Sequence, residues 1–348
     1  MKKIMLMTGI LSSILLVKCG PKMNESSKRS GKSVDLTNVD PMPFAESITA
    51  DELKEMLYVY ASDEFEGRNT GEPGQKKAAE YLKDFYVSQD IPAALDSTYF
   101  QTVPESFFRA GSGIKASENV VAYIKGSTKP EEYIVVSAHL DHVGVREDGE
   151  VFNGADDDGS GTVGVLEIAE AFNKAVEAGY RPQRSIVFLH VTGEEKGLYG
   201  SRYYAENPIF PIANTVADLN IDMIGRVDDA HADNENYIYL IGSDKLSTEL
   251  DSISTAVNNK YMNIDLDYTY NDENDPNRFY YRSDHYNFAK QGVPIIFYFN
   301  GVHADYHKVS DTPDKINYPM LAKRAQLVFL TAWELANRKD RIVVDKTP

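Results

Sequence analysis

The stretch Tyr133-Ile-Val-Val-Ser-Ala-His-Leu-Asp141 decides the fold. Its first part, residues 133–137, is a nearly continuous apolar run, which is typical of a buried strand. Similar runs occur at 185–191, 215–221 and 293–299, and segments with helical character lie between them. Apolar strands that alternate with helices are typical of a largely parallel sheet with both faces covered. We therefore predict an α/β fold, in which a mixed, largely parallel β-sheet is flanked by helices on both faces.

The predicted helices fit the same pattern. One begins after Thr49-Ala-Asp-Glu52, which has the spacing of a capping box. Another presents an apolar face, and three more follow along the chain. The apolar face consists of Ala78, Tyr81, Leu82 and Phe85, and the later helices are expected at 162–178, 284–290 and 320–337.

Composition limits the possible functions. The chain has 348 residues and a formal net charge of −17, and 42% of its residues are hydrophobic. This is enough apolar material for a packed core. Nucleic acid is excluded as a partner, because binding to its phosphates needs clustered Lys and Arg. No composition break follows residue 48, so we predict one domain over residues 48–340.

The N-terminus indicates export. Met1-Lys-Lys3 is basic, and Ile4–Val17 is an apolar run of about 14 residues, too short for a membrane span but typical of a signal peptide. We predict a signal peptide over residues 1–18 and a polar tether over 19–47.

The only cysteine, Cys19, directly follows the signal peptide. Leu16-Val-Lys-Cys-Gly20 resembles a bacterial lipobox, in which the cysteine is acylated, although Lys18 replaces the usual small residue. Two alternatives follow. The protein is a lipoprotein of the bacterial cell envelope, attached to the membrane only through Cys19, or it is periplasmic or secreted without an anchor.

Metal-binding residue types follow the predicted strands, and parallel strands bring their carboxyl ends to one edge of a sheet. Taken alone, a His-x-Asp pair can be structural, and three consecutive acids can cap a helix or bind calcium. Together, two His and several carboxylates at one edge have the composition of a zinc site. The residues are His139, Asp141, Glu194, Glu195, Asp222, His307 and the loop acids Asp156, Asp157 and Asp158.

Six motifs in this order resemble the co-catalytic di-zinc aminopeptidases, a family that includes bacterial leucyl aminopeptidase, aminopeptidase S and aminopeptidase Y. The resemblance extends from about residue 61 to 315. The motifs are His139-Leu-Asp141, Gly154-Ala-Asp-Asp-Asp-Gly-Ser-Gly161, Gly193-Glu-Glu-Lys-Gly-Leu-Tyr-Gly-Ser201, Ile221-Asp-Met223, Arg282-Ser-Asp-His285 and Tyr306-His307.

The resemblance implies two Zn²⁺ ions. Carried over by motif, His139 and Asp222 hold one ion, and Glu195 and His307 hold the other. Asp157, the middle acid of its run, bridges the two. Two zinc ions and three carboxylates leave a net positive charge of about one, which would stabilise a bridging hydroxide.

The resemblance also implies roles for residues beside the metals. Glu194 is expected to be the general base, and Asp141 to orient the ring of His139. The hydroxyl of Tyr306 would help to stabilise the oxyanion, unless this ring only packs in the wall. The Asp157–Asp158 peptide bond is expected to be cis.

The implied activity is zinc-dependent removal of N-terminal amino acids from peptides with free N-termini. Dipeptide-releasing and carboxypeptidase activities also occur on this scaffold, and the loops 226–239 and 268–281 are expected to determine specificity. One alternative is a glutaminyl cyclase, which uses one zinc for acyl transfer. Another is a binding module without catalysis, although such relatives lose metal ligands and this sequence keeps all five positions.

Other polar residues have no assigned role. A catalytic triad of Ser283, Asp284 and His285 lacks the Gly-x-Ser-x-Gly elbow that would accompany it. Four histidines remain unassigned, one of which is predicted to lie in the core because it is in the middle of a strand. These are His142, His231, His303 and the core residue His190.

Overall fold

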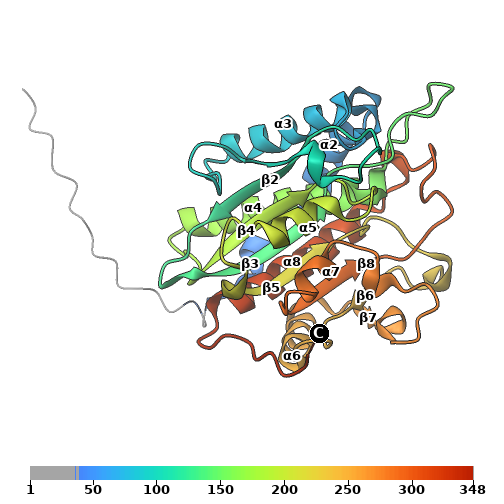
Figure 1. Ribbon diagram of the computed structural model, residues 1–348. Helices are drawn as coiled ribbons and strands as arrows, with labels where there is room; N and C mark the ends of the chain where they lie inside the picture. The colour runs from blue at the N-terminus through green and yellow to red at the C-terminus, as the bar shows by residue number, and fades with distance from the viewer. Residues whose placement is uncertain (1–35, 37–38, 348) are drawn as a thin grey trace, which may run out of the picture. The chain divides into compact units, whose positions relative to one another are not determined.

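The computed structural model describes Leu36 and residues 39–347, which contain an eight-stranded sheet (Figure 1). The strand order is β1-β2-β4-β3-β5-β8-β6-β7, and the four central strands β4, β3, β5 and β8 are parallel. Antiparallel pairing of β1 with β2, β2 with β4 and β6 with β8 makes the sheet mixed. The predicted fold class is confirmed. The strands are β1 Phe100–Val103, β2 Ser117–Ile124, β3 Lys129–His139, β4 Arg184–Val191, β5 Thr215–Ile221, β6 Tyr237–Ile241, β7 Asp265–Asp267 and β8 Ile295–Phe299.

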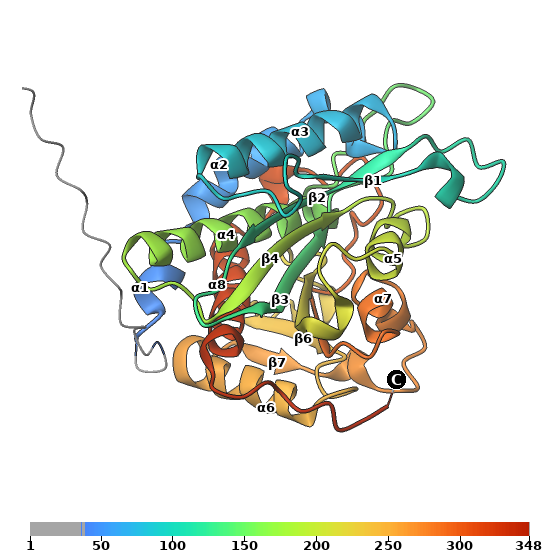
Figure 2. The same cartoon turned by 60° about the vertical axis from the view of Figure 1, so that its left-hand side comes forward.

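Helices cover both faces of the sheet, as Figures 1 and 2 show. Alternate residues of β3 divide between the faces: Ile134 and Val136 join the apolar cluster under α2, α3, α4 and α8, whereas Tyr133 and Val135 pack with residues of α5 and α7. The α2 N-cap is Thr49, as the capping box predicts. The helices are α1 Met42–Ala45, α2 Ala50–Tyr60, α3 Pro73–Ser88, α4 Gly161–Glu177, α5 Tyr199–Glu206, α6 Thr248–Val257, α7 His285–Ala289 and α8 Tyr318–Asn337.

The folded region begins earlier than residue 48. The short helix α1 lies within the predicted tether, and the side chains of Leu36 and Ala45 are buried in the main core. Burial of these apolar side chains stabilises the folded conformation at the end of the predicted tether. The predicted signal peptide 1–18 and Cys19 lie outside the described residues. Within the described part of the chain, no helix has both the length and the apolarity needed to cross a membrane.

Candidate metal centre

The ends of the central strands bring the predicted ligands to one edge of the sheet. His139 is the last residue of β3, and Asp222 directly follows β5. Glu195 lies in the loop after β4, and His307 lies in the loop after β8. Asp157 comes from the segment Ala155–Ser160, which leads into α4 between β3 and β4. Five residues that are distant in sequence therefore meet above the parallel strands.

Asp157 lies between two groups of ligand atoms. Its Oδ1 is 3.2 Å from His139 Nε2, which is itself 3.7 Å from Asp222 Oδ1. Its Oδ2 is 2.9 Å from His307 Nε2, which is 3.2 Å from Glu195 Oε2. Each oxygen of this one carboxylate thus faces a different His–carboxylate pair, which is the arrangement of a ligand that bridges two cations.

These close contacts are not hydrogen bonds. His139 Nε2 and Asp157 Oδ2 are both buried, and neither has a hydrogen-bond partner in the described chain. Buried polar atoms normally have a partner, so unpartnered ligand atoms that converge fit a cation held between them. Imidazole nitrogens and carboxylate oxygens are ligands that zinc accepts. The residues present therefore fit the two zinc ions that the resemblance implies.

The carboxylates of the other two loop acids, Asp156 and Asp158, already make hydrogen bonds within the protein. Asp158 accepts backbone N–H bonds from His139 (3.2 Å), Gly161 (2.9 Å) and Met223 (3.0 Å), although its carboxylate also lies near His139 and Asp222. Asp156 accepts from the Gly225 N–H at 2.7 Å and contacts His303 Nε2 at 3.1 Å.

Of the three acids, only Asp157 has a buried oxygen without a hydrogen-bond partner. This supports the assignment of the middle acid as the bridge. The Asp157–Asp158 peptide bond is cis, as predicted.

The carboxylates of the site favour a positive charge at His139 and His307. Burial lowers the pKa of His307, but Asp157 and Glu195 outweigh this effect and raise the pKa to about 10. In the same way, Asp157 and Asp222 outweigh burial and raise the pKa of His139 well above its ordinary value. The clustered carboxylates thus favour a cation at each histidine. A bound metal ion would supply this positive charge and replace the protons on the two histidines.

Asp141 supports the site differently from the prediction. His139 Nδ1 is 3.0 Å from the backbone oxygen of Asp141 but 3.9 Å from its carboxylate, so the backbone oxygen sets the ring orientation. The carboxylate instead accepts the Thr70 hydroxyl at 2.6 Å and the Glu194 backbone N–H at 3.1 Å. Because the buried carboxylate of Asp141 accepts the Glu194 N–H, it fixes the start of the loop that carries both glutamates.

Glu194 borders a cavity that His139, Asp157 and Asp222 also line. Burial raises the pKa of Glu194 well above its ordinary value, and the negative charge of Glu195 adds to this effect. Glu194 thus lies beside the candidate ligands but outside their close contacts.

Tyr306 lies in the same cavity, and its ring stacks on that of His307 with centroids 3.9 Å apart. Burial raises the pKa of Tyr306, as do the nearby carboxylates, so its hydroxyl stays protonated and can donate a hydrogen bond. The remaining lining is largely apolar, with one arginine. It consists of Met223, Phe279, Phe297, Phe299, Val302 and Arg282.

A buried arginine joins two of the ligand-bearing loops. The guanidinium of Arg68 is 1% exposed and donates to the backbone oxygens of Leu140 (3.2 Å), Asn153 (2.7 Å) and Gly154 (2.8 Å). Leu140 lies between His139 and Asp141, and Gly154 precedes the acid loop. The turn-rich segment around Arg68 therefore fixes the spacing of these loops, a role that the sequence pattern did not indicate.

Of the histidines without a predicted role, His142 is closest to the candidate ligands. Its Nδ1 is 2.9 Å from Glu195 Oε1. His190 is a core residue, as predicted, since its Nε2 lies 2.7 Å from the Tyr86 hydroxyl and burial lowers its pKa to about 3. His231 contacts Asp228 at 2.8 Å, away from the ligands.

The Ser-Asp-His motif forms no triad. Asp284 binds the Ser201 hydroxyl, His285 Nε2 lies 2.8 Å from the Tyr280 backbone oxygen, and Ser283 accepts from Asn220 at 3.0 Å. The three side chains are thus engaged with other groups, and the His285 ring stacks on Phe297, a residue of the cavity wall.

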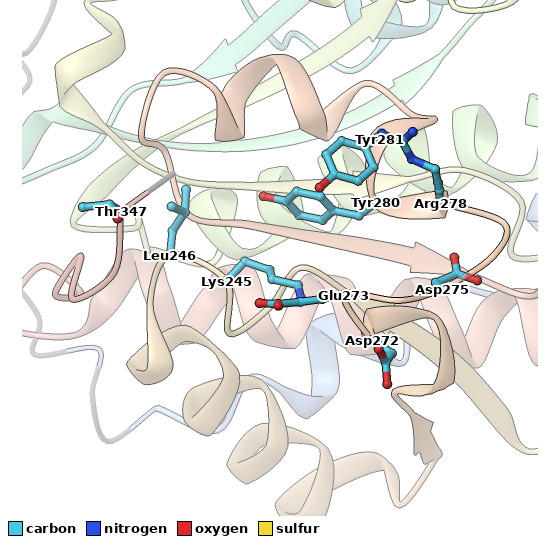
Figure 3. A pocket seen from close by; sticks show the side chains of 9 residues that line it. All are labelled: Lys245, Leu246, Asp272, Glu273, Asp275, Arg278, Tyr280, Tyr281 and Thr347. Atoms are coloured by element: carbon cyan, nitrogen blue, oxygen red, sulfur yellow. The ribbon is translucent and has the colours of Figure 1, made fainter.

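A second, larger cavity of about 390 Å³ also borders the segment 278–282, and Figure 3 shows the side chains that line it. Tyr280 and Tyr281 line it, whereas Phe279 and Arg282 line the cavity beside the metal ligands. Its remaining lining mixes acids such as Asp272 with bases such as Lys245.

The predicted specificity loop 268–281 therefore contributes to both cavities. The predicted bounds of the other loop, 226–239, are partly wrong, because its last residues belong to strand β6.

Comparison with known proteins gives the same picture. Over 260 residues the chain is 29% identical to leupeptin-inactivating enzyme 1 of Streptomyces exfoliatus, a match that covers 74% of this chain and 50% of that protein. The chain thus spans about half the length of this relative.

Two solved structures show the fold. The LapA aminopeptidase of Legionella pneumophila has a TM-score of 0.65 at 23% identity and covers 86% of this chain and 75% of its own. A glutaminyl cyclase of Bacteroides thetaiotaomicron has a TM-score of 0.62 at 16% identity and covers 84% and 99%. The fold alone therefore does not separate peptidase from cyclase. Residues 119–332 match Peptidase family M28, and the chain belongs to this family.

Proposed function

We propose that this protein is a zinc-dependent exopeptidase that removes N-terminal amino acids from peptides. The observation that carries the proposal is the position of Asp157, whose Oδ1 is 3.2 Å from His139 Nε2 and whose Oδ2 is 2.9 Å from His307 Nε2. A carboxylate shared in this way serves two metal ions, whereas the cyclase alternative needs one. All five ligand positions are filled, which speaks against a binding module.

The chain's own residues supply the rest of the chemistry. Bound zinc would act as a Lewis acid on the peptide carbonyl and make water a nucleophile at neutral pH. Glu194 would take a proton from the attacking water and pass it to the leaving amine. Tyr306, protonated and in the same cavity, is placed to donate to the oxyanion.

The side chains around this small cavity, of about 30 Å³, favour an apolar first residue in the substrate, and its walls would have to move apart to admit one. Phe279, Phe297 and Phe299 line it beside Glu194, and an apolar side chain would be desolvated there without leaving a polar group unpaired. The carboxylate of Glu194, which belongs to neither proposed metal site, could accept a hydrogen bond from the free α-amino group of a peptide. Both features fit peptides with free N-termini as substrates.

A panel of arylamides tests the proposal. Zinc-loaded enzyme should hydrolyse leucine and phenylalanine arylamides with free N-termini, and blocking the amino group should abolish the activity. Release of arylamine is followed by absorbance, with dipeptide arylamides as a test of the dipeptide-releasing mode. Conversion of glutaminyl substrates to the cyclic product, without hydrolysis of the others, would establish the cyclase instead.

We also propose that the protein is exported and anchored in the bacterial cell envelope through an acylated Cys19. The support is the sequence pattern at 1–20 alone. Wild-type protein should then fractionate with membranes, and its N-terminal peptide should carry acyl mass, whereas Cys19→Ala should be soluble or unprocessed. Soluble wild-type protein without acyl mass would instead mean periplasmic or secreted enzyme without an anchor.

A further inference from the structure

His142 lies three residues after His139, the candidate ligand at the end of β3. It follows Asp141 and is fully buried. Its backbone N–H donates to the Arg68 backbone oxygen at 3.3 Å, and it forms an isolated bridge with Asn69. The backbone of His142 is thus fixed by the same segment that supports His139, and its ring points toward the loop after β4.

Three buried atoms without hydrogen bonds converge at this ring. His142 Nδ1 is 2.9 Å from Glu195 Oε1 and 3.8 Å from Asp157 Oδ2. None of the three atoms has a hydrogen-bond partner in the described chain. Together they form a group of possible metal ligands. Two of the residues, Asp157 and Glu195, already belong to the second half of the proposed metal centre.

The ring of His142 differs from those of the other buried histidines. His190, His285 and His303 each have one ring nitrogen in a hydrogen bond, to Tyr86, Tyr280 and Asp156. In His142 both nitrogens lack a partner. A core histidine normally satisfies at least one nitrogen, so this ring needs another explanation.

Close packing holds the ring in place. Gly154, with φ +54°, lies against it, and a Cβ atom at this position would be 2.5 Å from the ring carbons of His142. A glycine is therefore required both by the backbone conformation and by the imidazole. Because Gly154 starts the acid loop, the position of Asp157 is coupled to the presence of this ring.

We infer that His142 is a further protein ligand of the metal ion held by Glu195 and His307. The inference rests on the proposed two-metal function. It makes the two sites unequal, since the second site has His142, His307, Glu195 and Asp157, whereas the first has only His139, Asp222 and Asp157. The site with fewer protein ligands keeps an open position and should bind zinc more weakly.

Metal titration tests this inference without reference to turnover. Metal-free enzyme is titrated with Zn²⁺ against a chromophoric chelator, and with Co²⁺ while its visible absorption is recorded. Wild-type protein should bind two equivalents, one more tightly. His142→Ala should weaken the tighter equivalent by more than about 100-fold, beyond the roughly 10–100-fold effect of a residue that only orients a ligand. The Co²⁺ spectrum of that site should change as well.

Two variants control for other effects. His142→Asn keeps a side-chain N–H near the position of Nδ1 and should lose the tighter metal too. If it retains wild-type affinity, His142 is a hydrogen-bond donor to Glu195 and the inference is wrong. His190→Asn removes another buried imidazole, which contacts Tyr86 at 2.7 Å, and should leave both metal affinities unchanged.

Unchanged affinities in His142→Ala would also overturn the inference. The peptidase proposal fails separately: zinc-loaded wild-type enzyme that binds two ions but hydrolyses none of the arylamides would contradict the function and leave the role of His142 intact.

Discussion

Glu194→Gln is expected to lower kcat by about 10²–10⁴-fold, the usual contribution of a general base, while two zinc ions stay bound. Glu194 lines the cavity with Asp157 and Asp222 but is absent from the close contacts that join the histidines to their carboxylates. The change therefore removes proton transfer and leaves the ligands in place. Steady-state kinetics on an apolar arylamide, together with metal analysis of the same preparation, measures both effects.

The neighbouring residue provides a matched control. Glu195 Oε2 is 3.2 Å from His307 Nε2, so Glu195→Gln should weaken metal binding itself. The same chemical change at adjacent positions should thus separate catalysis from metal affinity. If Glu194→Gln keeps more than about a tenth of the wild-type activity, another group is the base.

The central half of the fold could be predicted from sequence because its signals are local. The runs at 133–137 and 185–191 are apolar on both faces, and this is a property of buried parallel strands. Their carboxyl ends carry the ligand residues, so the location of the site followed from the prediction that these strands are parallel. The outer strands β1, β2, β6 and β7, of which β1 and β7 form the edges of the sheet, were not predicted. They are short or pair with remote segments, as β2 does with β4, and such pairing has no local signal.

Parts of the site depend on contacts that no local pattern reveals. The guanidinium of Arg68 donates to carbonyls 72, 85 and 86 residues away, so its role appears only in the folded chain. For His142 a signal existed, since a second histidine of metal-binding type follows His139 at the end of a strand. What the sequence lacked was its proximity to Glu195, which arises because the loop after β4 packs beside it.

The second large effect is expected for Asp157→Asn. An asparagine has one acceptor oxygen and one NH₂ group, which cannot bind a metal ion. Oδ1 and Oδ2 of Asp157 face His139 and His307 respectively, so in either amide orientation one metal site loses its shared ligand. The charge that offsets the two ions falls as well. We expect both zinc equivalents to bind more weakly, and turnover to be lost at zinc concentrations that saturate the wild type.

Asp158→Asn is the control for this change, because it alters the adjacent acid of the same loop. Asp158 accepts N–H bonds from His139, Gly161 and Met223, so its neutralisation should weaken three charge-assisted contacts and lower the melting temperature. Metal affinity measured at a temperature where the variant is folded should change less than in Asp157→Asn. The opposite order, with metal lost in Asp158→Asn and both equivalents retained in Asp157→Asn, would move the bridge to Asp158. In that case at least one of the three backbone N–H bonds to Asp158 would have to break, because two of its roughly four acceptor sites would be needed for the ions. The buried Oδ2 of Asp157 has no hydrogen bond to lose.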